Sequence, residues 1–203
     1  MERNYSVSEV IFVDDHSCDS TSAQIKACSR NFPFVTLLSL NNERGKGAAI
    51  RMGFEKSRCD ILVTMDGDQQ YSPLDIPAVL QPILDGSADL VVGKGSNHSS
   101  IVRRVSSRLF QLIFTSIFWL PLSAPNEGLK AILKVKFDEL DVTANGFDFD
   151  IEILVKAKRR LFRIKEIEVE RHERTTGKSK VHVLPTAARM CARMARLWLF
   201  QRK

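Results

Sequence analysis

Two apolar runs in this chain each end in an acidic turn. Residues 61–70 read Ile-Leu-Val-Thr-Met-Asp-Gly-Asp-Gln-Gln, and residues 10–21 read Val-Ile-Phe-Val-Asp-Asp-His-Ser-Cys-Asp-Ser-Thr. The apolar part of each run predicts a buried strand, and ligands of open α/β sheets bind outside the carboxyl ends of such strands. Both turns are therefore expected at the same edge of one sheet. Because carboxylates gathered there would repel one another without a cation or hydrogen-bond donors, the simplest occupant is a metal-bound phosphate ligand, which points to a nucleotide.

Strand and helix patterns alternate through the first half of the chain. Strands are predicted over residues 10–14, 34–40, 61–66 and 90–93, and helices over residues 20–29, 47–57 and 74–84. This alternation predicts an α/β fold, with a mostly parallel sheet flanked by helices. In the second half, residues 151–157 are predicted to form a core helix, and residues 164–169 alternate as an edge strand does.

Two other segments of the second half are apolar or amphipathic. Residues 109–122 are almost wholly apolar, but a bilayer span needs about 20 apolar residues, so this segment is either a buried helix or one lying in a membrane interface. Residues 183–203 predict a basic amphipathic helix, in which Cys191 and Trp198 belong to an apolar stripe and Arg193 is one of the surrounding cations. Such a helix either lies on an anionic membrane surface or packs on the sheet.

Composition limits the class of protein. With 203 residues, 44% of them hydrophobic, the chain can bury one substantial core. A formal net charge of +6 favours anionic partners, but no aromatic-basic pattern of a recognised DNA or RNA module occurs, so nucleic acid is not an expected partner. The four cysteines form no CxxC pair, which argues against a zinc site or a disulfide framework. The start of the chain has no secretory signal, and a cytoplasmic location is expected.

Each candidate motif also has a purely structural interpretation. Residues 14–21 can form a strand-to-helix turn in which Asp19 or Ser20 caps the following helix. An Asp-x-Asp triplet is common in surface turns, but here a strand precedes it and Gln70 adds a hard oxygen ligand, which suits Mg²⁺ or Mn²⁺. Residues 45–47, Gly-Lys-Gly, precede a helix whose start attracts phosphate, and glycines allow close backbone approach. A plain loop explains them equally well.

The order and spacing of six motifs resemble one enzyme family. These motifs are VDDHSCDST (13–21), NNERGKGAAIRMG (41–53), TMDGDQQYSP (64–73), ADLVVGKG (88–95), GFDFDIEILVKA (146–157) and RTTGKSK (174–180). Together they resemble the family 2 glycosyltransferases of GT-A fold. Within that family they are most similar to the branch of dolichol-phosphate mannosyltransferases and polyprenyl-phosphate glycosyltransferases. The resemblance runs from about Val10 to Val181.

The resemblance implies a donor side and a metal for the site. Asp15, with Asp14 behind it, would hydrogen-bond the base of a nucleotide diphosphate sugar, and Asp66 would lie near the ribose. Lys46 belongs to the same donor-binding set.

The implied cofactor is Mg²⁺ or Mn²⁺, held by Asp68 and Gln70, which would neutralise the departing nucleoside diphosphate as a Lewis acid. Asp66, Asp68 and Arg174 form the expected catalytic set.

The resemblance also implies an acceptor side. Arg104 and Ser107 match an Arg-x-x-Ser pattern of the family and would hold the phosphate of a polyprenyl phosphate. Arg174, Ser179 and Lys180 would close over the phosphates, since arginine suits bidentate phosphate contacts. Because the attacking phosphate oxygen is already ionised at neutral pH, no strong general base is expected.

The implied function is transfer of a hexose, mannose or glucose, to a polyprenyl phosphate by a peripheral protein at the cytoplasmic face of a membrane. A nucleotide-sugar half is expected over about residues 1–98, an acceptor half over about 99–182 and the amphipathic helix over 183–203. The strand and Pro-x-x-Asn-Glu-like turn that open the family do not precede Val10, so its first strand is expected to be missing. The competing hypothesis is a non-catalytic remnant or interaction subunit with weak or no donor binding.

Overall fold

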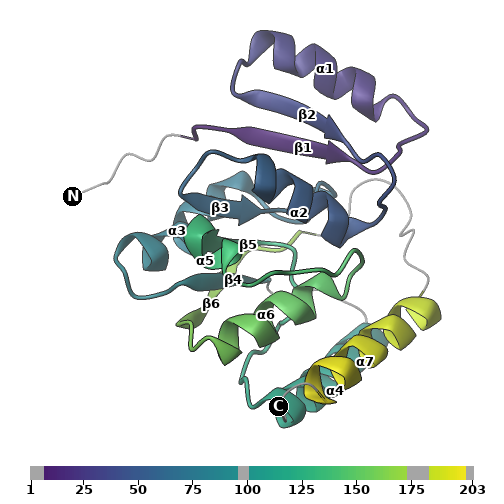
Figure 1. Cartoon of the computed structure of the whole chain (residues 1–203), viewed down its shortest axis with the longest axis vertical. Helices are drawn as coiled ribbons and strands as arrows, with labels where there is room; N and C mark the ends of the chain where they lie inside the picture. The colour runs from purple at the N-terminus through teal and green to yellow at the C-terminus, as the bar shows by residue number, and fades with distance from the viewer. Residues whose placement is uncertain (1–6, 96–100, 173–182, 200–203) are drawn as a thin grey trace.

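The computed structural model describes residues 7–95, 101–172 and 183–199. Its strands are β1 (Val10–Asp14), β2 (Val35–Ser39), β3 (Ile61–Thr64), β4 (Leu90–Gly95), β5 (Lys130–Leu133) and β6 (Ile164–Val169). Its helices are α1 (Thr21–Asn31), α2 (Lys46–Lys56), the 3₁₀ turn η1 (Pro73–Asp75), α3 (Ile76–Leu84), α4 (Ile101–Phe118), α5 (Lys134–Asp138), α6 (Phe149–Arg159) and α7 (Val183–Leu199). Figure 1 shows the helices around the strands, and the predicted α/β fold is confirmed.

The strands form two sheets rather than one. β1 and β2 pair in parallel, from Val10 opposite Val35 to Asp14 opposite Ser39. The second sheet has the order β3-β5-β4-β6, in which β4 and β6 are parallel and β5 is antiparallel to both of its neighbours. In Figure 1, β1 lies next to β3 and points the same way, but among the described strands β1 pairs only with β2 and β3 only with β5. The expectation that both acidic turns end strands of one sheet is therefore wrong.

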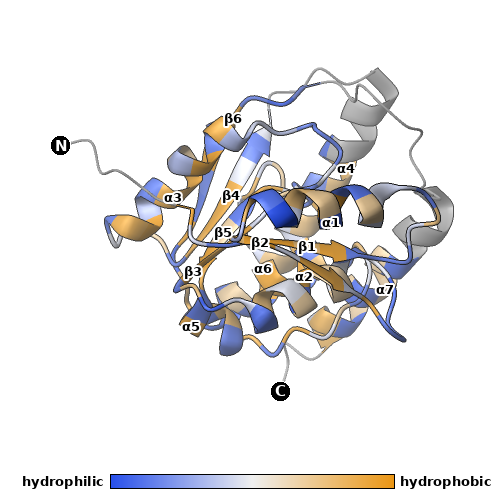
Figure 2. Ribbon diagram, turned by 90° about the horizontal axis from the view of Figure 1, so that it is seen from above, coloured by the Kyte–Doolittle hydropathy of each residue, from blue (hydrophilic) through white to orange (hydrophobic). Residues whose placement is uncertain are grey.

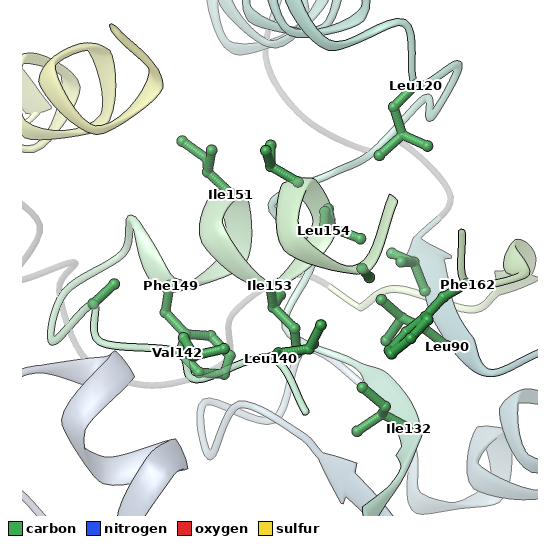
Figure 3. Packing of buried hydrophobic residues seen from close by; sticks show 14 of the residues in the cluster. Leu90, Leu120, Ile132, Leu140, Val142, Phe149, Ile151, Ile153, Leu154 and Phe162 are labelled. Carbon is green, nitrogen blue, oxygen red and sulfur yellow. The ribbon is translucent and has the colours of Figure 1, made fainter. Parts of the chain in front are cut away.

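Helices cover both faces of the strands. Figure 2 shows α1 and α3 on one side and α2 and α6 on the other. The helix α6 is the centre of the larger core, because Phe149, Ile153 and Leu154 are fully buried and pack in one cluster with Leu90 and Ile132 of the sheet (Figure 3). Each such side chain contributes about 1.5 to 3 kcal/mol by burial. This packing fixes the position of α6 and of the polar groups that it carries.

The apolar segment 109–122 forms most of α4. The helix ends at Phe118, where Trp119 takes a positive φ of 51°, because Pro121 cannot continue a helix and restricts the residue before it. Phe114 and Phe118 are buried in the core. Leu109 and Leu112 of the same helix are 59% and 64% exposed, so α4 combines a buried face with an exposed apolar one.

The helix α7 packs against α6 and lies beside α4. Within residues 189–199 of this helix, Met194 and Leu197 are buried, whereas Cys191 and Trp198 of the expected apolar stripe are exposed. Arg193 donates from Nε to the Asp148 carboxylate at 2.9 Å, so this arginine faces the protein and not a membrane. Across the described helices, none is both long and apolar enough to cross a bilayer.

Candidate functional site

The turn after β3 meets the start of α2. The Lys46 ammonium lies 3.2 Å from an oxygen of Asp66 and 3.2 Å from an oxygen of Asp150, at the start of α6. Burial would lower the pKa of Lys46, but the negative charges of Asp150 and Asp66 outweigh it and raise that pKa well above its usual range. Lys46 is therefore a permanent cation whose two partners are protein carboxylates. One of them, Asp66, belongs to the loop of residues 65–70 after β3, which is called the donor loop below because the sequence predicts that it binds the donor.

The glycines on either side of Lys46 let the backbone pack closely against residues 144–146. Gly45 has a φ of 105°, and a Cβ atom on Gly47 would come within 2.4 Å of the Ala144 carbonyl oxygen. The Ala48 N–H, in the first turn of α2, donates to the Asn145 carbonyl at 3.1 Å. Of the two interpretations of the Gly-Lys-Gly stretch, this geometry favours the plain loop over a phosphate cradle.

The turn after β1 is organised by its own aspartates. Asp14 accepts from the Ser17 N–H at 3.1 Å and from the Ser22 hydroxyl at 2.7 Å, and these hydrogen bonds lower the pKa of its carboxyl. Asp14 thus holds the turn in shape, and its place in the donor-binding set stays a prediction. Asp19 accepts from the N–H of Thr21, the first residue of α1, at 3.0 Å, whereas the N-cap residue Ser20 makes no capping hydrogen bond with its side chain.

Asp15 links the two acidic turns. Its Oδ2 atom accepts from the Gly45 N–H at 2.9 Å, and its Oδ1 atom lies 3.4 Å from Nδ1 of His16. The next residue along the chain, Lys46, contacts Asp66. The residue pair 45–46 therefore brings together turns from two separate sheets, which is the convergence that the sequence predicts.

A second set of polar residues, farther from the surface, supports Asp66. Lys130 of β5 contacts Asp150 at 2.7 Å, and each of the two side chains is only 2% exposed. Lys130 also donates to the Glu127 carbonyl. Asp66 itself packs against the backbone of Gly128, where a Cβ atom would lie 2.2 Å from Oδ2. The donor loop is thus supported by residues from the half of the chain assigned to the acceptor.

Arg171 ties the end of β6 to the same loop. Its Nη2 atom donates to Gln70 Oε1 at 3.1 Å, and its Nη1 atom lies 3.2 Å from both carboxylate oxygens of Glu127. Glu127 also accepts from the Tyr71 hydroxyl. Burial raises the pKa of Glu127, although the nearby cations of Arg171 and Lys130 oppose that effect. The Arg171 guanidinium therefore holds the side chains of Gln70 and Glu127 close to each other.

The donor set fits a divalent cation in part. Asp66 and Asp68 are separated by one residue, and both carry the hard carboxylate oxygens that Mg²⁺ and Mn²⁺ prefer. A Cβ atom on Gly67, between them, would meet nothing within 4 Å, so the loop has open space at this point. The amide oxygen of Gln70 is engaged by Arg171 in this arrangement. No cluster of three or more His, Cys, Asp or Glu side chains suited to a metal occurs within the described residues.

The expected acceptor residues are only partly covered by the structure. Arg104 and Ser107 lie in α4, but their side chains fall outside what the structure describes, and Arg174, Ser179 and Lys180 lie outside the described residues altogether. The described chain reaches His172, whose N–H donates to the Gln70 carbonyl at 2.9 Å. The chain therefore enters the basic segment 173–182 directly beside the donor loop.

Sequence reasoning missed four polar residues of this region: Glu127, Lys130, Asp150 and Arg171. A signal was available for Asp150, because an acidic residue in the first turn of a core-helix pattern rarely becomes fully buried without a partner. Lys130 gave a similar signal, since it opens a short apolar run. Glu127 and Arg171 gave none, because their partners are distant in sequence.

Comparison with known proteins agrees with these observations. Residues 1–132 match the family model described as Glycosyl transferase family 2. The chain is 28% identical to a dolichol-phosphate mannosyltransferase of Pyrococcus furiosus, over 85% of this chain and 50% of that protein. It is 29% identical to an undecaprenyl-phosphate 4-deoxy-4-formamido-L-arabinose transferase of Pseudomonas fluorescens, over the same shares. The chain thus spans about half the length of these curated relatives.

Solved structures support the fold. Glucosyl-3-phosphoglycerate synthase of Mycobacterium tuberculosis, crystallised with Mn²⁺, UDP-glucose and phosphoglyceric acid, superposes with a TM-score of 0.79 at 20% identity. The superposition covers 95% of this chain and 69% of that one. At this identity the likeness concerns the GT-A-type fold alone.

Proposed function

Because the chain belongs to glycosyl transferase family 2, we propose that it transfers a sugar from a nucleotide diphosphate sugar to the phosphate of a polyprenyl phosphate. The names of the relatives from Pyrococcus and Pseudomonas support a polyprenyl phosphate as the acceptor. The sugar is proposed to be a hexose, mannose or glucose. In the reaction, the bond from the anomeric carbon to the donor phosphate breaks, and a bond from that carbon to an acceptor phosphate oxygen forms.

One observation carries the proposal: the two acidic turns meet at residues 45–46. Asp15 contacts Gly45, and Asp66 contacts Lys46, so carboxylates suited to a nucleoside and to a metal-bound diphosphate stand on either side of one short segment. Of the two expected metal ligands, Asp68 would hold Mg²⁺ or Mn²⁺, and Asp66 would take the place of Gln70, whose amide oxygen accepts from Arg171. When bound, that ion supplies Lewis-acid stabilisation of the leaving diphosphate.

The chain's own residues would bind and orient the two substrates. Asp15 would orient the base, and the contact with Lys46 would fix the direction of the Asp66 carboxylate. The acceptor phosphate is anionic at neutral pH and can attack without losing a proton to the protein. This agrees with the two described histidines, since His16 is held by the carbonyl of Asn41 and His172 lies beside Glu170.

Peripheral attachment at the cytoplasmic face of a membrane belongs to the same proposal. A polyprenyl acceptor must be met at a bilayer surface, and α4 carries exposed apolar side chains at Leu109, Leu112 and Ile113. Their spacing of three and four residues places them on one face of the helix. Such a face is suited to shallow insertion among lipid headgroups.

A second candidate is a non-catalytic interaction subunit of the same fold. It is favoured by the division of the strands into two sheets, which leaves β1 and β3 without a second partner among the described strands. It is also favoured by the engagement of Gln70 with Arg171. This candidate differs from the enzyme in one measurable respect, since it binds no donor in a metal-dependent way.

The deciding experiment is titration of the purified chain with GDP-mannose and UDP-glucose, with and without Mn²⁺, by calorimetry. We expect Mn²⁺-dependent binding of one donor, and loss of that binding in Asp68→Ala, because the variant removes a metal-binding carboxylate. Asp60→Ala, an exposed carboxylate at the opposite end of β3, is the matched control and should bind as the wild type does. Absence of donor binding in the wild type would favour the interaction subunit.

A further inference from the structure

Three charged side chains form a buried chain of contacts that ends at the donor loop. Lys130 lies 2.7 Å from Asp150, Asp150 lies 3.2 Å from Lys46, and Lys46 lies 3.2 Å from Asp66. Exposure rises along this chain, from 2% for the side chains of Lys130 and Asp150 to 14% for Lys46 and 37% for Asp66. The charges thus lead from the core to the surface of the candidate site.

Stability alone does not explain why these charged side chains are buried. A buried ion pair costs desolvation energy that its mutual attraction often fails to recover, so apolar residues of similar size hold a core together as well or better. Asp150 keeps a lowered pKa because the cations of Lys130 and Lys46 outweigh the effect of burial. Charges retained in this way gather at functional sites more often than in the rest of a core.

The buried charges contact the residues that surround the Asp66 carboxylate. This carboxylate contacts the Lys46 ammonium and also lies against the backbone of Gly128, where there is no room for a side chain. Lys130 donates to the Glu127 carbonyl, one residue before Gly128. Both neighbours of Asp66 are therefore connected to Asp150, Lys46 directly and Gly128 through the Glu127 carbonyl and Lys130.

We propose that Asp150 is a positioning residue for the donor loop, which fixes the direction of the Asp66 carboxylate through Lys46 and the Glu127–Gly128 backbone through Lys130. The inference rests on the proposed function and deepens it. Asp150 touches neither substrate, and its effect on binding passes through these two lysines. Because α6, β5 and residues 127–128 come from the expected acceptor half, Asp150 also joins that half to the donor loop.

The test compares two buried carboxylates of α6. Asp150→Asn removes the charge that faces Lys46, whereas Glu152→Gln removes one that is 1% exposed and is paired with Lys156 and the Ala144 N–H instead. Binding of GDP or UDP in the presence of Mn²⁺ is measured by calorimetry on folded protein. We expect Asp150→Asn to weaken it about tenfold or more, the usual loss when an outer partner of a metal-binding group is removed. Glu152→Gln should leave it unchanged.

A double variant guards against failure to fold. Asp150→Asn combined with Lys130→Met removes both wholly buried charges, so no unpaired ammonium remains in the core. This variant should fold with a cooperative thermal transition and still show the weakened nucleotide binding. Wild-type affinity in either Asp150 variant, or an equal loss in Glu152→Gln, overturns the positioning role alone. A wild-type chain without Mn²⁺-dependent nucleotide binding overturns the proposed function, and the inference with it.

Discussion

Gly128 lies directly against the Asp66 carboxylate. A Cβ atom at this position would come within 2.2 Å of Oδ2 and 2.4 Å of Cγ, so in Gly128→Ala the side chain of Asp66 must turn away from Lys46. We expect Mn²⁺-dependent nucleotide binding to weaken about tenfold, as for other changes that misplace a metal-binding carboxylate. Calorimetric titration of the purified variant checks this value.

The control for that variant is Gly53→Ala in α2. Its Cβ atom would lie 3.4 Å from Val13 Cγ2, an ordinary contact, and alanine stabilises a helix interior by up to about 1 kcal/mol relative to glycine. Gly53→Ala should therefore bind nucleotide normally and unfold at a slightly higher temperature. If Gly128→Ala also binds nucleotide normally, the close approach of Gly128 to Asp66 is not needed for nucleotide binding.

At the scale of residues, the sequence predicts what is local. The aspartates at positions 14, 15, 66 and 68 can be recognised because each stands at the end of a strand pattern or within two residues after it. Asp150 cannot be assigned to the site in this way, because Lys46 lies 104 residues away from it. Gly45 and Gly47 show the reverse case, since a phosphate-type motif proves to pack against the carbonyls of residues 144 and 145.

At the scale of elements, the longer patterns are predicted and the shortest are missed. β1, α6 and β6 lie within a few residues of their predicted ranges, and β6 is an edge strand as expected. β5 was not predicted, because its four residues begin with a lysine and give no alternation to recognise. Lys130 is buried there because Asp150 of α6 faces it, a contact that local sequence does not encode.

The pairing of β4 with β6 begins at a charged clamp that can be tested. Asp89 accepts from the Arg163 N–H at 2.8 Å, and its two oxygens lie 2.7 and 3.0 Å from the guanidinium. We expect Asp89→Asn to lower the free energy of unfolding at pH 7 by about 1.5 kcal/mol. This is the low end for bonds to charged groups, because the Arg163 side chain is 56% exposed. Urea denaturation measures the difference.

The pH dependence of this effect has a definite sign. Hydrogen bonds from Arg163 lower the pKa of Asp89 in the folded protein. The stabilisation is therefore complete above the unfolded pKa of about 3.9 and is lost as the pH falls through the lower folded value. The gap between wild type and Asp89→Asn should shrink over that range. The control is Glu168→Gln, because the Glu168 side chain is 87% exposed and lies 3.5 Å from its partner Lys94; this variant should have no measurable effect on stability over the same pH range.

At the scale of the whole molecule, the alternating pattern predicts the α/β class but not the division into two sheets. Strand pairing depends on partners far apart in sequence, and each strand pattern alone is compatible with either arrangement. The site still assembles, because residues 45–46 contact both acidic turns, Gly45 through Asp15 and Lys46 through Asp66. The sequence thus predicted correctly that the acidic turns lie close together, although the prediction that both follow strands of one sheet is wrong.

The exposed side of α4 gives the molecule an apolar surface that its core does not use. Leu109, Leu112 and Ile113 are 59%, 64% and 45% exposed, and α7, with the exposed Arg196, lies beside α4. Insertion of the apolar face would resist salt, whereas attraction of arginine to anionic lipid is screened at high ionic strength. The two contributions can therefore be separated by flotation with vesicles at low and high salt.

We expect the double variant Leu112→Ser and Ile113→Ser to lose most of the salt-resistant binding to vesicles that contain anionic lipid, because it removes the centre of the apolar face. Arg196→Gln should reduce only the salt-sensitive part, by about 1 kcal/mol for one charge near the surface. Val135→Ser, at a 63% exposed apolar residue of α5, should bind as the wild type does, because α5 lies apart from α4 (Figure 1). Unchanged flotation of the α4 variant would mean that this face does not meet the bilayer, and the polyprenyl acceptor would have to reach the donor loop by another surface of the protein.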